Sequence, residues 1–138
     1  MPDAGQGRRG FRFVRMYTAG SGHTTFADVE IPGPPVWAEG VRNHVLGDIP
    51  ASTVNIIELL GRRPRLEPHA PPRRQWVVIL QGAMEISTTA GERRRFERGD
   101  CLLAEDMAGS GHLTDDVGDE RLVTLNIGVP ESWRCPGS

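Results

Sequence analysis

Residues 75–82 read QWVVILQG, and residues 83–89 read AMEISTT. Each run is short, rich in apolar side chains and bounded by polar or glycine residues, which is typical of β-strands. The two runs therefore predict a hairpin that turns near Gly82. Polar clusters lie on both sides of it, from His69 to Gln75 and from Gly99 to His112. This arrangement predicts a small β-barrel with a polar site inside.

A period of two recurs along most of the chain, with few helical stretches. About eight short strands follow from it, which predicts an all-β sandwich or closed barrel in one domain, residues 11–130, between tails at 1–10 and 131–138. Only Val36 to Leu46 has room for a short helix or an irregular lid. The predicted strands are Phe11 to Thr18, Thr24 to Ile31, Thr53 to Leu60, Gln75 to Gln81, Met84 to Thr89, Arg93 to Phe96, Cys101 to Ala104 and Arg121 to Val129.

Composition limits the function classes. The 138 residues carry a net charge of −2, and all 16 basic residues are arginine, which excludes Schiff-base lysine chemistry. Glutamates interleave the arginine clusters and aromatic residues are absent from them, so we expect no nucleic-acid partner. No apolar run reaches the roughly 18 residues that span a bilayer, so we expect no membrane partner and a cytoplasmic protein. Cys101 and Cys135 are expected to be reduced thiols.

At residues 75–82 the chain resembles the first motif of the cupin superfamily. His69 matches the first histidine of that motif, Gln75 stands at its glutamate and Gly82 at its glycine, while Pro71 stands where a second histidine is usual. The segment from Gly99 to His112 resembles the second motif, with two more residues before the histidine than the usual pattern. The resemblance spans about Thr53 to Val129. It implies a jelly-roll β-barrel, usually dimeric, with the motif histidines facing a metal.

The resemblance implies one divalent metal ion (Fe, Mn, Ni or Zn) held by His69, Gln75 and His112. Half of the usual ligand set is missing, because a neutral amide and a proline replace a carboxylate and an imidazole. A cation held by neutral ligands alone keeps its charge in a partly dry barrel, so Asp106, Glu105 or Glu58 would have to substitute. Metal binding stays open at this point, and we expect no nucleotide or organic cofactor.

Strand parity indicates what surrounds the site. If Gln75 faces inward, Val77 and Ile79 do too, whereas the alternate residues of the strand face outward. The outward row of Trp76, Val78 and Leu80 is apolar and should pack on a neighbouring sheet or on a second subunit, which favours a homodimer.

Further residues are candidates for the wall that binds substrate. Asn126 is one of them. Asn55 is another if its side of the strand faces inward together with Ile57 and Leu59. The same strand equally allows the other side to face inward, with Val54, Ile56, Glu58 and Leu60. Asp106 follows a predicted strand and either caps its loop or contacts the ligand. Trp37 either covers the pocket or packs. The expected substrate-binding set is Asn55, Val77, Ile79, Asp106, Asn126 and Trp37.

The expected catalytic residues are His69, Gln75 and His112. Two imidazoles can act as base and acid on opposite faces of a small organic molecule, and the Gln75 amide can donate to a developing oxyanion, which predicts an isomerase, dehydratase or lyase, or cyclase. An iron-dependent dioxygenase and a non-catalytic small-molecule binder or sensor are the alternatives. An arginine-only basic set with many Ala, Gly and Pro residues is typical of a GC-rich bacterial source, where small cupins serve specialised metabolism.

Overall fold

The computed structural model describes residues 10–34, 38–59 and 70–136. Within them the chain is all-β, with nine strands arranged in two sheets that do not close into a barrel. The strands are β1 (Phe11–Thr18), β2 (Thr24–Ile31), β3 (Thr53–Leu59), β4 (Gln75–Gln81), β5 (Ala83–Thr88), β6 (Arg93–Glu97), β7 (Cys101–Ala104), β8 (His112–Val117) and β9 (Leu122–Gly128).

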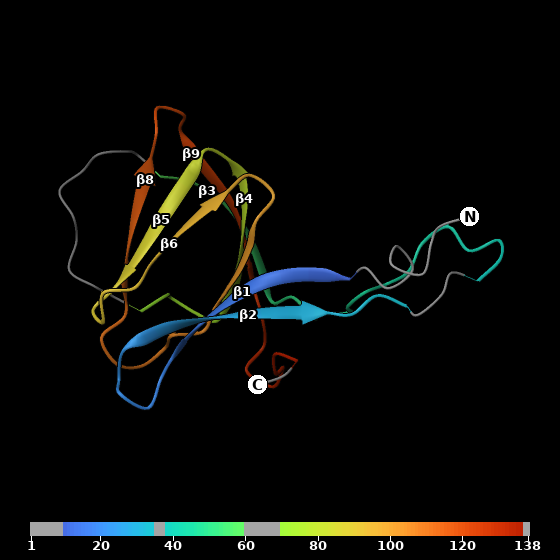
Figure 1. Ribbon diagram of the computed structural model, residues 1–138, viewed down its shortest axis with the longest axis horizontal. Helices are drawn as coiled ribbons and strands as arrows, with labels where there is room; N and C mark the ends of the chain where they lie inside the picture. The colour runs from blue at the N-terminus through green and yellow to red at the C-terminus, as the bar shows by residue number, and fades with distance from the viewer. Residues whose placement is uncertain (1–9, 35–37, 60–69, 137–138) are drawn as a thin grey trace.

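The larger sheet has the strand order β2-β1-β7-β4-β9-β3, and the smaller sheet has the order β6-β5-β8 (Figure 1). Neighbouring strands are antiparallel except β1 and β7, which run parallel. β4 and β5 are joined by one tight turn yet belong to different sheets, so the chain passes from the larger sheet to the smaller one at this turn. The hairpin that the sequence predicts at Gly82 is therefore a corner between two layers.

The predicted strands are observed within one or two residues of their expected ends, but one strand is missed. The sequence analysis names no strand at β8, which forms the edge of the smaller sheet against β5. The helix allowed for residues 36–46 is absent from the described part, 38–46, which has no regular structure. Within the described residues, no helix is long and apolar enough to cross a bilayer.

The main core lies between the sheets. Both sheets contribute alternate side chains to it, as strands with one buried face do. From the larger sheet come Met16, Phe26, Val77, Ile79, Leu102, Ala104 and Leu122, and from the smaller come Met84, Ile86 and Phe96. Val77 and Ile79 thus face inward together, as the strand parity predicts.

A second apolar cluster covers the outer face of the larger sheet. Trp76 packs edge-on against Phe13, with ring centroids 4.7 Å apart, and lies 5.9 Å from Trp133, whose C-terminal segment also buries Cys135. Trp76 is only 8% exposed, so its own chain covers it, which is one of the two alternatives expected for the outward row. Leu80, further along the strand, does remain exposed.

Gly82 makes the corner between the sheets possible. Its φ is +75°, a conformation that L side chains rarely adopt, and a Cβ there would lie 2.5 Å from the carbonyl oxygen of Arg121. The glycine of the first motif is therefore required both by its backbone angle and by the close approach of another strand.

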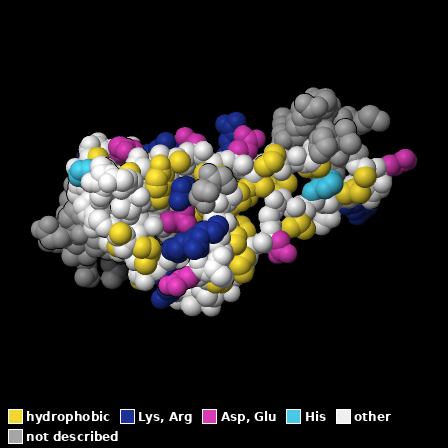
Figure 2. All heavy atoms as spheres, turned by 90° about the horizontal axis from the view of Figure 1, so that it is seen from below, with side chains coloured by type: hydrophobic (Ala, Val, Ile, Leu, Met, Phe, Trp, Pro, Cys, Tyr) yellow, Lys and Arg dark blue, Asp and Glu magenta, His cyan; other side chains and the backbone are white. Residues whose placement is uncertain are grey.

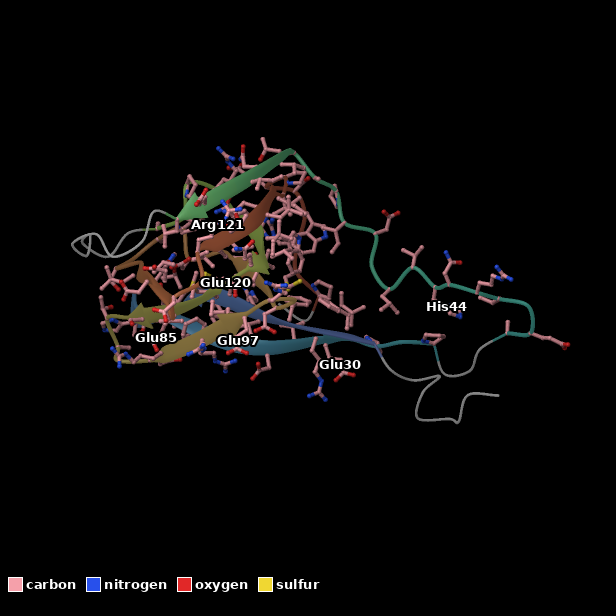
Figure 3. All side chains as sticks on the ribbon, turned by 90° about the horizontal axis from the view of Figure 1, so that it is seen from above. Glu30, His44, Glu85, Glu97, Glu120 and Arg121 are labelled. Carbon is pink, nitrogen blue, oxygen red and sulfur yellow. The ribbon has the colours of Figure 1, made fainter. Side chains whose placement is uncertain are left out.

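An arm of residues 38–52 extends from the body beside the open end of the β1–β2 hairpin, as Figure 1 shows. Val41, Val45 and Leu46 of this arm are exposed, with Val45 at 80%, whereas Ile49 packs against the cluster around Trp76. Hydrophobic side chains are visible on the surface of this part of the molecule in Figure 2. Figure 3 places His44 on this arm, away from Glu85 and Glu97 on the smaller sheet.

Candidate functional site

Seven polar side chains are buried in the described part of the chain. They are Thr24, Gln75, Thr88, Asp106, His112, Thr124 and Asn126. Burying polar groups costs free energy unless they find partners, so a cluster of them inside an apolar core calls for an explanation beyond packing. Most belong to, or follow, strands whose inner faces line the space between the sheets.

The register of β3, β9 and β4 brings the predicted wall residues onto one face. Asn55 lies opposite Asn126, and Asn126 lies opposite Val77. Gln75 is two residues from Val77 on the same strand and therefore shares its face. This register also decides between the two alternatives for β3, because it places Asn55, Ile57 and Leu59 on the inner face and Val54, Ile56 and Glu58 on the outer face.

His112 begins β8 opposite Thr88 and belongs to the inner face of the smaller sheet. Its Nδ1 lies 2.6 Å from Oδ2 of Asp106, and the hydroxyl of Thr24 donates to the same oxygen at 2.8 Å. Asp106 is fully buried, and His112 is 6% exposed. The structure thus joins two of the predicted site residues, together with Thr24, which the sequence analysis missed.

The loop that carries Asp106 is held by the β1–β2 turn. Thr18 donates from its hydroxyl to the Ala108 carbonyl at 2.8 Å, and the Ser110 amide donates to Gly22 at 3.0 Å. At Gly109, φ is +74° and a Cβ would lie 2.1 Å from the Gly22 carbonyl oxygen, so only glycine fits this contact. The carboxylate of Asp106 is therefore placed by a loop that is fixed at several points.

Glu105 precedes Asp106 and has a different role. Its carboxylate accepts from Nε of Arg15 at 2.5 Å and from Nη2 of Arg74 at 2.5 Å, and its side chain is 8% exposed. Arg74 also donates to the carbonyl of Trp133 at 2.8 Å, which ties the C-terminal segment to this ion-paired cluster. Arg74 is thus engaged on the outer side of the larger sheet.

The amides of the inner face have different surroundings. Asn126 accepts a hydrogen bond from the Thr124 hydroxyl at 2.7 Å. Gln75 is 7% exposed, and within the described parts of the chain its amide has no hydrogen-bond partner. A buried amide without a partner in this part of the chain is available to water or a ligand.

The β3 edge of the larger sheet is exposed. At the opposite side, the edge strands β2 and β6 are bridged by Arg94, whose guanidinium donates to Asp28 at 2.8 Å and lies over the Phe26 ring. Along β3 the inward-facing Ile57 and Leu59 are 42% and 36% exposed, and Asn55 is exposed as well. The β3 edge, which pairs with Asn126, is therefore exposed on its inner face as well.

The described residues do not by themselves fit a metal centre. Within residues 10–34, 38–59 and 70–136, no group of three or more His, Cys, Asp or Glu side chains gathers. Of the predicted ligands, His112 and Gln75 lie in this part. A hydrogen bond from Nδ1 to a carboxylate does orient metal-bound histidines, but one imidazole and one amide are too few for a divalent ion.

Two predicted site residues, His69 and Trp37, lie outside the described residues. Of the other two histidines, His44 is on the arm, and His23 is in the β1–β2 turn with its Nδ1 2.6 Å from the Thr89 hydroxyl. Thr24 and Thr124 carried no sequence signal that could distinguish them from ordinary strand threonines.

A surface hollow of about 350 Å³ lies at the end of the fold away from His112, near the turn of Gly82. Its rim is charged, but Arg98 pairs with Glu120 at 2.8 Å and Arg95 with Glu97 at 2.9 Å (Figure 3 labels both glutamates). These charges compensate each other across exposed positions, so the buried polar cluster is the stronger candidate.

No protein-family model matches this chain, and no curated protein matches it either.

Proposed function

We propose that this protein is an enzyme that moves protons on a small organic molecule, as an isomerase, lyase or cyclase does, with His112 as the group that gives or takes the proton. The observation that carries the proposal is the hydrogen bond between buried Asp106 and buried His112. An imidazole is the side chain best suited to proton transfer near neutral pH, and a carboxylate partner is the usual support for a working histidine.

The amides of the inner wall complete the proposed chemistry. The substrate enters past β3 and lies against Gln75 and Asn126. His112 removes a proton from a carbon next to a carbonyl group, the electron pair moves onto the carbonyl oxygen, and the Gln75 amide donates a hydrogen bond to that oxygen. Return of the proton to another atom gives an isomer, and loss of a neighbouring group gives an elimination product.

We also propose that the two-sheet fold is of the cupin type. Gly82 at the corner between sheets, and Gln75 and His112 facing the same interior, support this reading of the two motifs. The metal that the resemblance implies at His112, Gln75 and His69 is an alternative to this reaction, because a ring nitrogen bound to a metal could not exchange a proton with the substrate. The proton transfer above is derived from the protein's own side chains and needs no metal.

A second copy of the chain is the proposed protein partner. By register, Val54 and Ile56 lie on the outer face of β3 beside Leu125 and Ile127 of β9, and they are 61% and 72% exposed. Together with Leu80 they form an apolar surface that continues the covered cluster around Trp76. Light scattering is expected to give a dimer, and the charged variant Ile56→Asp a monomer.

Deuterium exchange tests the proposed reaction without knowledge of the product. The protein is incubated in D₂O with a panel of small ketones, aldehydes and hydroxy-carbonyl compounds, and NMR follows exchange at the carbon next to each carbonyl. We expect catalysed exchange for at least one compound, loss of it in His112→Ala, and full retention in His44→Ala, a control on the arm. Equal exchange in wild type and His112→Ala would refute the proposal.

A further inference from the structure

We infer that Asp106 and Thr24 are positioning residues that hold the imidazole of His112 with its proton on Nδ1, so that Nε2 is the nitrogen that exchanges a proton with substrate. The catalytic meaning of this inference rests on the proposed function. The protonation state of the ring does not rest on it, and it is measurable without a substrate.

The geometry around one oxygen carries the argument. Oδ2 of Asp106 receives the Thr24 hydroxyl at 2.8 Å and lies 2.6 Å from Nδ1 of His112. An ionised carboxylate is only an acceptor, so Nδ1 must be the donor in that contact. The Thr24 hydroxyl donates to the same oxygen and so holds that oxygen in place. Nδ1 therefore carries a proton whether the ring is neutral or charged, and the lone pair of the neutral ring is on Nε2.

Burial gives this arrangement its specificity. Asp106 and Thr24 are both 0% exposed, and Thr24 lies on the larger sheet whereas His112 lies on the smaller one. In such surroundings water does not compete for the carboxylate oxygen, and charge-assisted hydrogen bonds are strong. Oδ1 of Asp106 has no hydrogen-bond partner among the described residues, so the carboxylate makes its contacts with His112 and Thr24 through Oδ2. Because it is fully buried, Asp106 acts through His112 and does not contact the substrate.

The β1–β2 hairpin thereby becomes part of the site. Thr24 begins β2, at the edge of the larger sheet, while His112 begins β8 at the edge of the smaller one. Asp106 connects them from the loop that Gly109 and Ser110 fasten to the β1–β2 turn. One buried oxygen therefore fixes the ring orientation relative to both sheets, as preorganised sites require.

The first test is nitrogen NMR of the wild-type protein with ¹⁵N-labelled histidine. At a pH where His112 is neutral, we expect Nδ1 at the frequency of a protonated ring nitrogen and Nε2 at that of an unprotonated one. The Nδ1 proton should be shifted far downfield and should exchange slowly with water. A ring of His112 with its proton on Nε2 would overturn the inference, whatever the outcome of the activity test.

Variants test which residues set this state. In Asp106→Asn the side-chain amide can donate to Nδ1, so we expect the proton to move to Nε2. In Thr24→Val, which keeps the shape of the side chain, Nδ1 stays protonated but its proton exchanges faster with water. Thr25→Val is the matched control, because the Thr25 hydroxyl donates to exposed Glu92 on the other face, and it should leave the spectrum unchanged. An unchanged ring in folded Asp106→Asn would contradict the inference.

Activity separates this inference from the proposed function. If deuterium exchange is found, Asp106→Asn should lower its rate on the order of 10²-fold with little change in KM, because the wrong nitrogen then carries the lone pair. If no exchange is found but the ring is protonated on Nδ1, the proposed reaction fails while the positioning role stands. If Asp106→Asn does not fold, the wild-type spectrum and Thr24→Val still decide the inference.

Discussion

Glu105 and Asp106 are neighbours in the chain, yet their carboxylates are used on opposite sides of the larger sheet. Glu105 is bound by Arg15 and Arg74 on the outer side, and Asp106 is bound by His112 and Thr24 on the inner side. Two adjacent acids thus divide into one that holds the fold together and one that serves the candidate site.

Replacing Glu105 with Gln is expected to destabilise the fold strongly. The change leaves two partly buried guanidinium groups without their anion, which costs about 3–5 kcal/mol when a buried ion pair loses one partner. The matched control is Glu120→Gln, which breaks the exposed pair with Arg98 and should cost about 1 kcal/mol or less. Urea denaturation measures both, and equal losses in the two variants would show that Glu105 has no special role.

We expect the Gln75 amide to contribute to function and not to the free energy of unfolding. Gln75 is buried without a hydrogen-bond partner among the described residues, so Gln75→Leu should leave the free energy of unfolding unchanged or raise it by about 1 kcal/mol. The same variant should lose catalysed deuterium exchange by roughly tenfold or more. A folded Gln75→Leu protein with full exchange would remove Gln75 from the site.

Gly82 and Gly99 allow a comparison of strain with steric conflict. Both have a positive φ, but a Cβ at Gly99 meets nothing within 4 Å, whereas one at Gly82 meets the Arg121 carbonyl at 2.5 Å. Gly99→Ala should therefore cost about 1 kcal/mol from backbone strain, and Gly82→Ala at least about 2 kcal/mol more. Thermal unfolding measures the difference, and similar values for the two variants would contradict the close approach at the corner.

The pair of Arg94 and Asp28 predicts a pH dependence of stability. The hydrogen bond and charge of Arg94 lower the pKa of Asp28 below its ordinary value of 3.8. Because the pKa of Asp28 is lower in the folded protein than in the unfolded chain, the pair stabilises the fold at pH values above the ordinary pKa. This stabilisation is lost as the pH falls through the lowered pKa of the folded state. The stability difference between wild type and Asp28→Asn should thus be constant near neutral pH and shrink below about pH 4. A difference independent of pH would contradict it.

The two cysteines are expected to react slowly. Neither is in a disulfide bond, and burial raises the pKa of both the Cys101 and the Cys135 thiols above the ordinary value of 9.0. Because the thiolate is the reactive form, iodoacetamide at pH 8 should label the native protein several-fold more slowly than the protein in urea. Mass spectrometry of Cys101→Ser and Cys135→Ser separates the two sites. Rapid labelling of the native protein would mean that the C-terminal segment opens.

Much of the fold could be predicted from the sequence, because polar residues alternate with apolar ones in parts of β1 and β2, and because β4 and β7 are short apolar runs. β8 was missed for a physical reason. Its inner-face residues are His112, Thr114 and Asp116, so the polar side chains that face the interior remove the very alternation by which strands are recognised. The inward direction of Gln75, Val77 and Ile79 was predictable from parity, and that of Asn55 required the register with Asn126.

The site was predictable only where a motif marked it. His112 and Gln75 are candidates because of the resemblance, and Asp106 is a candidate because it follows a predicted strand. The link between Asp106 and Thr24 could not be found in this way, because it depends on the parallel pairing of β1 with β7, which brings together residues that are 82 positions apart. Local pattern carries no information about such long-range pairing.

The parallel pairing of β1 with β7 also has a consequence for how the chain acquires its structure. The first hairpin leaves the ribosome early, but it cannot join the sheet until β7, and then His112, have been synthesised. Non-local pairing of this kind slows folding, because the entropy of closing a long loop is lost before any contact compensates it. Nascent chains should therefore remain sensitive to proteases until translation has passed β8, and the hairpin should gain protection in a single late step.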